Sequence, residues 1–207
     1  MFNDKCSMTS LPKLILASAS PRRSEILTAV GWDFEKHSAD IDETALPNES
    51  PADYVQRLAK EKAETVAANY RNALVLGADT IVVIENQIIG KPKDFDDARR
   101  MLQTLSGNWH EVLTGVALVK TSEPSASADG LPPQSETKVG IQRTKVKFAE
   151  MTNVEIEFLI ERGAPLDKAG AYAVQAQAAL FIEQIQGDYW NVVGLPINLV
   201  HRLSKEI

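Results

Sequence analysis

Two adjacent arginines follow a serine-containing turn near the start of the sequence, where a helix is expected to begin. The turn and the helix start read Ser18-Ala19-Ser20-Pro21-Arg22-Arg23. Ser is a favoured N-cap residue and Pro suits the first helical position. The first turn of a helix has free N–H groups and partial positive charge, which favours acidic rather than basic residues there. Two interpretations are open: the serines and arginines hold an anion such as phosphate, or both arginines point into solvent.

A lysine interrupts the apolar face of the helix expected over residues 51–68. Val55, Leu58 and Val66 mark that face, and Lys62 lies four residues after Leu58 and four before Val66. A buried ammonium group without a partner is costly. The spacing therefore predicts either an anion at Lys62 or a long side chain that extends to the surface.

A lone carboxylate, Asp79, lies within an almost continuous apolar run over residues 73–84. A carboxylate in such a run is expensive unless it is paired, binds a metal or takes part in chemistry. Gly77 allows a neighbouring group to approach the strand closely. A structural ion pair and a functional acid both remain open for Asp79. Lys91 and Lys168 are ordinary loop lysines unless they bind the same anion as the arginines and Lys62.

Composition limits the classes of protein that these residues can serve. The chain has 207 residues, 44% hydrophobic and 24% charged, which suits one folded domain, expected over residues 11–207, after a flexible leader over residues 1–10. The net charge of −6 argues against a surface that coats nucleic acid or anionic membrane. A single cysteine, Cys6, excludes an internal disulfide framework and a Cys-rich zinc site, so a reducing, cytoplasmic location is expected.

Hydrophobic patterns and helix-capping signals predict alternating strands and helices. Strands are expected at residues 14–18, 73–84, 88–89, 112–119, 139–148, 179–185 and 189–193. Helices are expected over residues 21–29 and 51–68, from near Asp94 to Ser106, from Thr152 to Gly163, and after Pro196. Residues 121–138, rich in Ser and Pro, are expected to form a loop. The alternation predicts an α/β protein with a mixed, twisted sheet flanked by helices.

The unusual residues lie in motifs that together resemble the Maf family of nucleoside triphosphate pyrophosphatases. The motifs are Leu16-Ala17-Ser18-Ala19-Ser20-Pro21-Arg22-Arg23, Gly77-Ala78-Asp79-Thr80, Gly90-Lys91-Pro92 and Asp167-Lys168-Ala169-Gly170-Ala171-Tyr172. They follow in order within a likeness that runs from about residue 14 to 203. The resemblance implies two lobes around a deep cleft, usually a homodimer, and hydrolysis of a nucleotide to its monophosphate and pyrophosphate with Mg²⁺ or Mn²⁺.

The resemblance also assigns roles to residues of this sequence. It implies that Asp79 is the catalytic proton acceptor, and Glu43 matches a further charged position of the family. Glu43 and Asp79 are together expected to bind the metal and to act on the water. The residues expected to bind phosphate are Ser18, Ser20, Arg22, Arg23, Lys62, Lys91 and Lys168.

Substrate choice is expected to depend on Arg22, Thr80 and Gln175, which match the family's specificity positions. The run Tyr172-Ala173-Val174-Gln175 resembles the branch that acts on dTTP and UTP. A Gln amide offers one donor group and one acceptor, which complement O4 and N3–H of uracil or thymine. Three alternatives remain. The first is the family branch that acts on 7-methyl-GTP, in which an acidic residue stands in place of Gln175. The others are a related purine-selective house-cleaning enzyme and a nucleotide-binding regulator of cell division.

Overall fold

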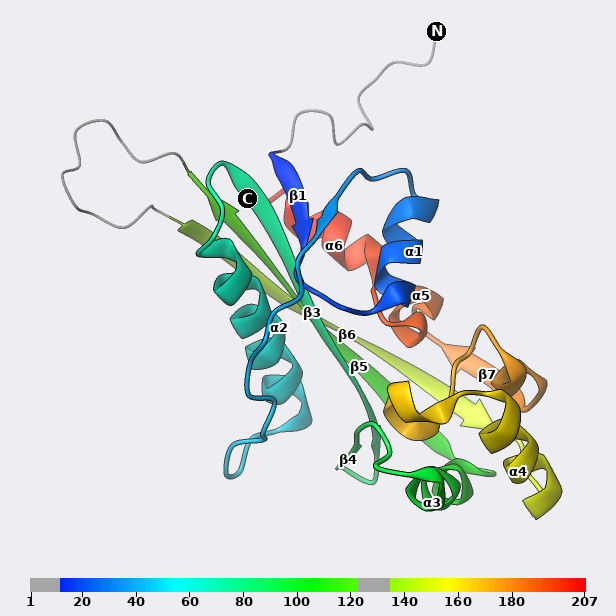
Figure 1. Cartoon of the computed structure of the whole chain (residues 1–207). Coiled ribbons are helices and arrows are strands. Elements are labelled where there is room, and N and C mark those ends of the chain that lie inside the picture. The colour runs from blue at the N-terminus through cyan, green and yellow to red at the C-terminus, as the bar shows by residue number, and fades with distance from the viewer. Residues whose placement is uncertain (1–11, 123–134) are drawn as a thin grey trace, which may run out of the picture.

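The computed structural model describes residues 12–122 and 135–207. Within this part of the chain, seven strands form one mixed sheet in the order β2-β1-β3-β5-β6-β7, and β4 pairs with β3 (Figure 1). The strands are β1 (Lys13–Leu16), β2 (Glu35–Lys36), β3 (Ala73–Ile84), β4 (Gln87–Ile89), β5 (Trp109–Thr121), β6 (Ser135–Phe148) and β7 (Ile182–Gln186). β1 runs parallel to β2 and β3, and the other pairs are antiparallel. The predicted α/β class with a mixed sheet is confirmed.

Helices cover both faces of this sheet. The helices are α1 (Pro21–Ala29), α2 (Pro51–Ala67), α3 (Phe95–Leu105), α4 (Asn153–Arg162), α5 (Tyr189–Val193) and α6 (Ile197–Ser204). α2 packs along β3 and β5 on one face, and α5 and α6 pack against β5 and β6 (Figure 1). α3 and α4 pack against each other near the end of the sheet that carries β4. Short 3₁₀ turns over Pro165–Asp167, Ala169–Ala171 and Gln177–Leu180 connect α4 to β7.

The core follows the alternation of side chains along the strands. Leu74 and Leu76 of β3 point to the face that carries Ile26 and Leu27 of α1, whereas Val75 points to α2. Because both faces are covered, β3 can be apolar almost throughout, as the sequence predicts. The expected division into two lobes stays a prediction.

Most predicted elements are confirmed, and one is wrong. Residues 189–193, expected as a strand, form helix α5, because the Asp188 side chain accepts a hydrogen bond from Trp190 N and caps a helical turn. The expected loop over 121–138 is shorter at both ends, since β5 extends to Thr121 and β6 begins at Ser135. The rest of that loop and the expected leader over 1–10 lie outside the described residues. Among the helices of the described part, none combines the length and apolarity needed to cross a membrane.

Candidate active site

The candidate site lies beside the middle of β3, where one edge of this strand has no strand partner. β1 pairs with residues 73–76 of β3, and β4 pairs with residues 82–84. Between them, over residues 77–81, no strand of the described chain pairs with this edge, while β5 pairs with the other edge throughout. The chain leaves β1 at this point and enters α1. Asp79 and Thr80 therefore face a gap in the sheet from opposite faces of the same strand.

Two glycines let the backbone of α2 lie directly against this part of the sheet. A Cβ atom added to Gly77 would lie 2.2 Å from the carbonyl oxygen of Ala59, and one added to Gly115 would lie 2.1 Å from that of Val55. Gly115 is the register partner of Asp79 on β5. This close contact, anticipated for Gly77 from the sequence, brings the next turn of α2 to Asp79.

Lys62 of α2 joins two carboxylates. Its Nζ atom lies 2.6 Å from Oδ1 of Asp79 and 2.6 Å from Oε1 of Glu43, which reaches the site from the loop before α2. The side chains of Lys62 and Asp79 are each only 11% exposed, so the anion predicted for Lys62 is present within the protein itself. Burial alone would raise the pKa of the Glu43 carboxyl, but the hydrogen bond and charge of Lys62, with Lys91 and Arg23, hold that pKa below its ordinary value.

Arg23 is buried on the opposite side of the gap. Its Nε donates to the carbonyl of Gly194 (2.9 Å), Nη1 to Ser18 Oγ (2.9 Å) and Nη2 to Thr80 Oγ1 (3.1 Å). All three partners are neutral, and burial lowers the pKa of the guanidinium more than the charge of Asp79 raises it. Each Nη atom keeps one further N–H group. The arrangement is a fixed, desolvated positive charge that favours an anion.

The start of α1 adds donors to the same side. Ser20 is the N-cap residue, yet its side chain makes no capping hydrogen bond, unlike Ser50 at the start of α2. Ser18 Oγ accepts hydrogen bonds from Ser20 N (3.2 Å) and Arg23 Nη1, so its own proton is free to be donated elsewhere. The helix N-terminus and these hydroxyl groups suit phosphate oxygens.

Arg22 and Lys168 meet at one carboxylate, Asp167. Arg22 Nη1 donates to Asp167 Oδ2 (3.1 Å), and Lys168 Nζ donates to Asp167 Oδ1 (2.6 Å) and to the carbonyl of Ala164 (2.5 Å). The hydrogen bonds and charges of the two cations outweigh the effect of burial and lower the pKa of Asp167. Asp167 lies in one of the sequence motifs, but no role for it was expected from the sequence.

One cavity of about 480 Å³ joins these groups. This volume is in the range of small-molecule binding sites. Every residue that the sequence analysis selected for the site lines it: Ser18, Ser20, Arg22, Arg23, Glu43, Lys62, Asp79, Thr80, Lys91, Lys168 and Gln175. The structure thus brings the predicted residues together, while the roles assigned to them remain predictions. Arg22, Arg23 and Lys62 all have polar partners within the protein, so the alternatives in which these side chains extend into solvent are not what the structure shows.

Tyr54 and Tyr172, for which the sequence predicts no role in the site, also line the cavity. The Tyr54 hydroxyl donates to the backbone carbonyl of Glu43 (2.8 Å), and burial with the nearby charges of Asp79 and Glu43 raises its pKa to about 12. Tyr172 shares a hydrogen bond of 2.8 Å with Nε2 of buried His110. Tyr54 lies on α2 eight residues before Lys62, but a tyrosine on a half-buried helix surface breaks no local rule, so no signal in the sequence identifies it.

The acidic residues of the site fit a divalent cation only together with a substrate. The described residues contain no group of three or more His, Cys, Asp or Glu side chains that could hold a metal. Glu43 and Asp79 are two carboxylates that converge on Lys62. Mg²⁺ is commonly bound by one or two carboxylates, several waters and the phosphates of a substrate. The donor set therefore suits such an ion next to a polyphosphate.

Comparisons with known proteins agree with this site. The model of the family described as Maf-like protein matches residues 13–207. A dTTP/UTP pyrophosphatase from Hahella chejuensis is 48% identical over 197 residues, which are 94% of this chain and 92% of that protein. Proteins of the same name from Symbiobacterium thermophilum and Bacillus cytotoxicus are 46% and 45% identical, over 91% and 95% of this chain and 90% and 96% of their own lengths.

Proposed function

The chain belongs to the Maf-like protein family, and from this premise we propose that it hydrolyses dTTP and UTP to the nucleoside monophosphate and pyrophosphate. The observation that carries the proposal is the meeting, in one cavity, of a lysine-bridged pair of carboxylates with a buried arginine and a free helix N-terminus. Three relatives named dTTP/UTP pyrophosphatase are 45–48% identical to this chain over most of its length.

The positive groups bind the triphosphate from two sides. Arg23 and the N-terminus of α1 are in place without a carboxylate partner among the described contacts, so phosphate oxygens supply the missing negative charge. Arg22 and Lys168 now share Asp167, and phosphate oxygens compete for them. Lys91 adds a further positive charge. Positioning and charge stabilisation are the main contributions of a protein to phosphoryl-transfer chemistry.

Asp79 orients the attacking water. Its Oδ1 accepts a hydrogen bond from Lys62 Nζ (2.6 Å). Oδ2 has no hydrogen-bond donor among the described contacts and can accept a water proton. The water oxygen attacks the α-phosphorus, the bond from that phosphorus to the bridging oxygen breaks, and pyrophosphate leaves. Asp79 then returns the proton to solvent.

Glu43 and Asp79 would hold Mg²⁺ or Mn²⁺, which when bound would neutralise charge on the phosphate oxygens. Lys62 contacts both carboxylates and sets their spacing before substrate arrives. The homodimer expected from the resemblance stays a prediction.

Gln175 selects the base, with Arg22 and Thr80. Gln175 lines the cavity and is exposed, so its amide is accessible to a base. Its N–H and carbonyl complement O4 and N3–H of uracil and thymine. The Thr80 hydroxyl is engaged with Arg23 and lies 2.9 Å from Thr114 Oγ1, so Thr80 acts on substrate choice through the position of Arg23.

A panel of nucleoside triphosphates with Mg²⁺ or Mn²⁺, with pyrophosphate and monophosphate both quantified, tests the proposal. We expect turnover of dTTP and UTP to exceed that of the purine nucleotides, with the two products formed in equal amounts. Gln175→Glu should lower kcat/KM for UTP by at least about tenfold, because a carboxylate loses the donor to O4 and repels it. Release of orthophosphate and the diphosphate would overturn the reaction, and an unchanged substrate ranking in Gln175→Glu would overturn the role of Gln175.

A further inference from the structure

The loop that carries Glu43 has little structure of its own. Residues 37–50 connect β2 to α2, and the described contacts give this loop one internal backbone hydrogen bond, from Glu49 N to Leu46 O. Residues 42–48 are all exposed, and the Glu43 side chain itself is 51% exposed. Packing therefore cannot explain why the Glu43 carboxylate points to Lys62.

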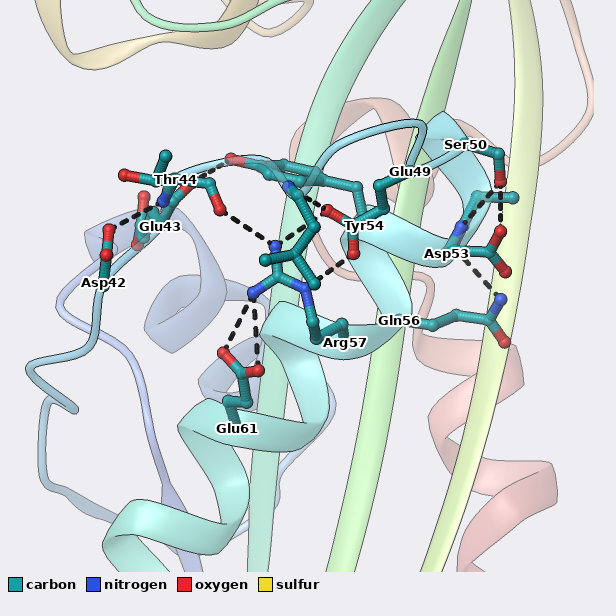
Figure 2. Close-up of polar contacts among 12 residues, drawn as sticks. Asp42, Glu43, Thr44, Glu49, Ser50, Asp53, Tyr54, Gln56, Arg57 and Glu61 are labelled. Atoms are coloured by element: carbon teal, nitrogen blue, oxygen red, sulfur yellow. Dashed lines mark hydrogen bonds and ion pairs between the residues drawn. The ribbon is translucent and has the colours of Figure 1, made fainter.

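Arg57 of α2 fastens this loop to the helix, as Figure 2 shows. Its Nε and Nη2 donate to the two carboxylate oxygens of Glu49, at 2.6 and 2.8 Å. Nη2 also donates to the backbone carbonyl of Thr44 (3.1 Å), and Nη1 donates to Glu61 Oε2 (3.2 Å). The Glu49 side chain is 7% exposed, and one of its oxygens also accepts from Leu46 N (3.0 Å). A planar guanidinium supports such a set of contacts, which a lysine cannot reproduce.

Tyr54 extends the same attachment to the next residue of the loop. Its hydroxyl donates to the carbonyl of Glu43, and the guanidinium of Arg57 lies 5.6 Å from the centre of its ring. Two consecutive carbonyl groups, those of Glu43 and Thr44, are thus bound by two side chains of α2 that contact each other (Figure 2). Because Lys62 lies on the same helix, α2 fixes both the backbone of Glu43 and the group that its carboxylate meets.

We propose that Arg57, together with Glu49 and Tyr54, positions Glu43 for the reaction. These side chains hold the Glu43 carboxylate in contact with Lys62, which also binds Asp79. The proposal rests on the role given to Glu43 under the proposed function. Arg57 and Glu49 contact neither Lys62 nor Asp79 in the described structure, so they act through the backbone of residues 43 and 44. Loss of this attachment frees the loop, and the second carboxylate is then present but misplaced.

A double-mutant cycle separates positioning from general stability. Glu43→Gln should lower kcat by about 100-fold, and Arg57→Gln by about tenfold with a smaller change in KM, as expected for the loss of a supporting contact. Combined with Glu43→Gln, Arg57→Gln should lower kcat by less than about twofold further, because no carboxylate remains to be positioned. Lys60→Gln is the matched control, since Lys60 lies on the same helix and, among the residues that the structure describes, forms an ion pair with Glu64 alone, at 3.7 Å. It should keep full activity.

Hydrogen exchange provides a second measurement that does not depend on activity. In Arg57→Gln, the amides of Leu46 and Glu49, which are hydrogen-bonded within the loop, should exchange at least about tenfold faster, whereas those in the middle of α2 should not change. Tyr54→Phe removes a single hydroxyl, and it should also lower kcat and speed up amide exchange in the loop. Full activity of Glu43→Gln would overturn the proposed role of Glu43. A tenfold or larger loss in Glu43→Gln without a loss in Arg57→Gln, or equal losses from Arg57→Gln in both backgrounds, would overturn the positioning role alone.

Discussion

The floor and the rim of the cavity are held in different ways. The floor consists of Arg23, Lys62 and Asp79, which belong to helices or to β3 and are mostly buried. The rim consists of Lys91, Asp167 and Lys168, which lie in loops and short turns. Backbone contact between α2 and the sheet places Lys62 beside Asp79, and three hydrogen bonds from its side chain fix buried Arg23. In the rim, Asp167 and Lys168 are held by exposed hydrogen bonds and ion pairs.

This difference indicates a division of work. Groups that must meet the reacting atoms within a few tenths of an ångström are best placed on regular elements. Groups that hold a flexible triphosphate can exchange one anionic partner for another. The floor is therefore expected to control turnover and stability, and the rim to control affinity and selection.

The largest expected effect is the loss of turnover in Asp79→Asn. The amide cannot accept the water proton, so kcat for dTTP should fall by about 10³-fold, within the range of general-base removal. Lys62 keeps Glu43 as a partner, so circular dichroism should show a folded protein. If Asp79→Asn retains a kcat within fivefold of the wild type, Asp79 has no part in proton transfer and the floor is only structural.

Breaking the backbone contact beneath the floor tests how it is fixed. In Gly77→Ala the new Cβ would meet the carbonyl of Ala59 at 2.2 Å, so α2 must shift and Lys62 with it. Urea unfolding should show a loss of about 3 kcal/mol, at the upper end of overpacking effects. Gly90→Ala is the control, because a Cβ there would have no neighbour within 4 Å, and its stability should change by less than about 0.5 kcal/mol. Equal stability of the two variants would show that α2 does not depend on Gly77.

The residues of the floor can be recognised in the sequence because each is of an unexpected type for its place in a helix or strand. Lys62 interrupts an apolar helical face, Asp79 an apolar strand, and Arg23 the positive end of a helix. Lys62 and Asp79 resolve each other's conflict across 17 residues of sequence, whereas Arg23 has only neutral hydrogen-bond partners in the described part of the chain. The pattern indicates that partners are needed but cannot locate them. Tyr54 and Arg57 break no rule, because a tyrosine and an arginine suit a half-buried helix surface. Their importance depends on loop carbonyls that no sequence pattern records.

The error at residues 189–193 has the same origin. Tyr189-Trp190-Asn191-Val192-Val193 contains residues that favour strands. Tertiary contacts decide otherwise: Asn191 is fully buried, and its Nδ2 donates to Val112 O (2.9 Å) and Thr144 Oγ1 (3.0 Å). A helical turn between Asp188 and Gly194 (φ +122°) presents that amide to the sheet. A short segment with polar contacts of this kind overrides local propensity.

Buried His110 of β5 should make the stability of the protein depend on pH. Burial lowers the pKa of His110 to about 4, against about 6.5 in an unfolded chain. The unfolded state therefore binds the proton first, and this contribution to stability is complete above pH 6.5 and decreases as the pH falls towards 4. Between pH 6.5 and 5 the free energy of unfolding should decrease by about 2 kcal/mol. In His110→Phe this decrease should be largely absent, and an unchanged slope would assign it to other groups.

The smallest effect is expected at the rim, in Asp167→Asn. The Asp167 side chain is 57% exposed, although its partners Arg22 and Lys168 are only 24% and 11% exposed. Exposed ion pairs contribute between 0 and about 1 kcal/mol, so urea unfolding should detect a loss below about 1 kcal/mol. Such a small loss is what binding requires, since Arg22 and Lys168 must leave Asp167 to reach phosphate oxygens at little cost. A loss above about 2 kcal/mol would mean that the rim is fixed as firmly as the floor, and the cations would then be poor phosphate ligands.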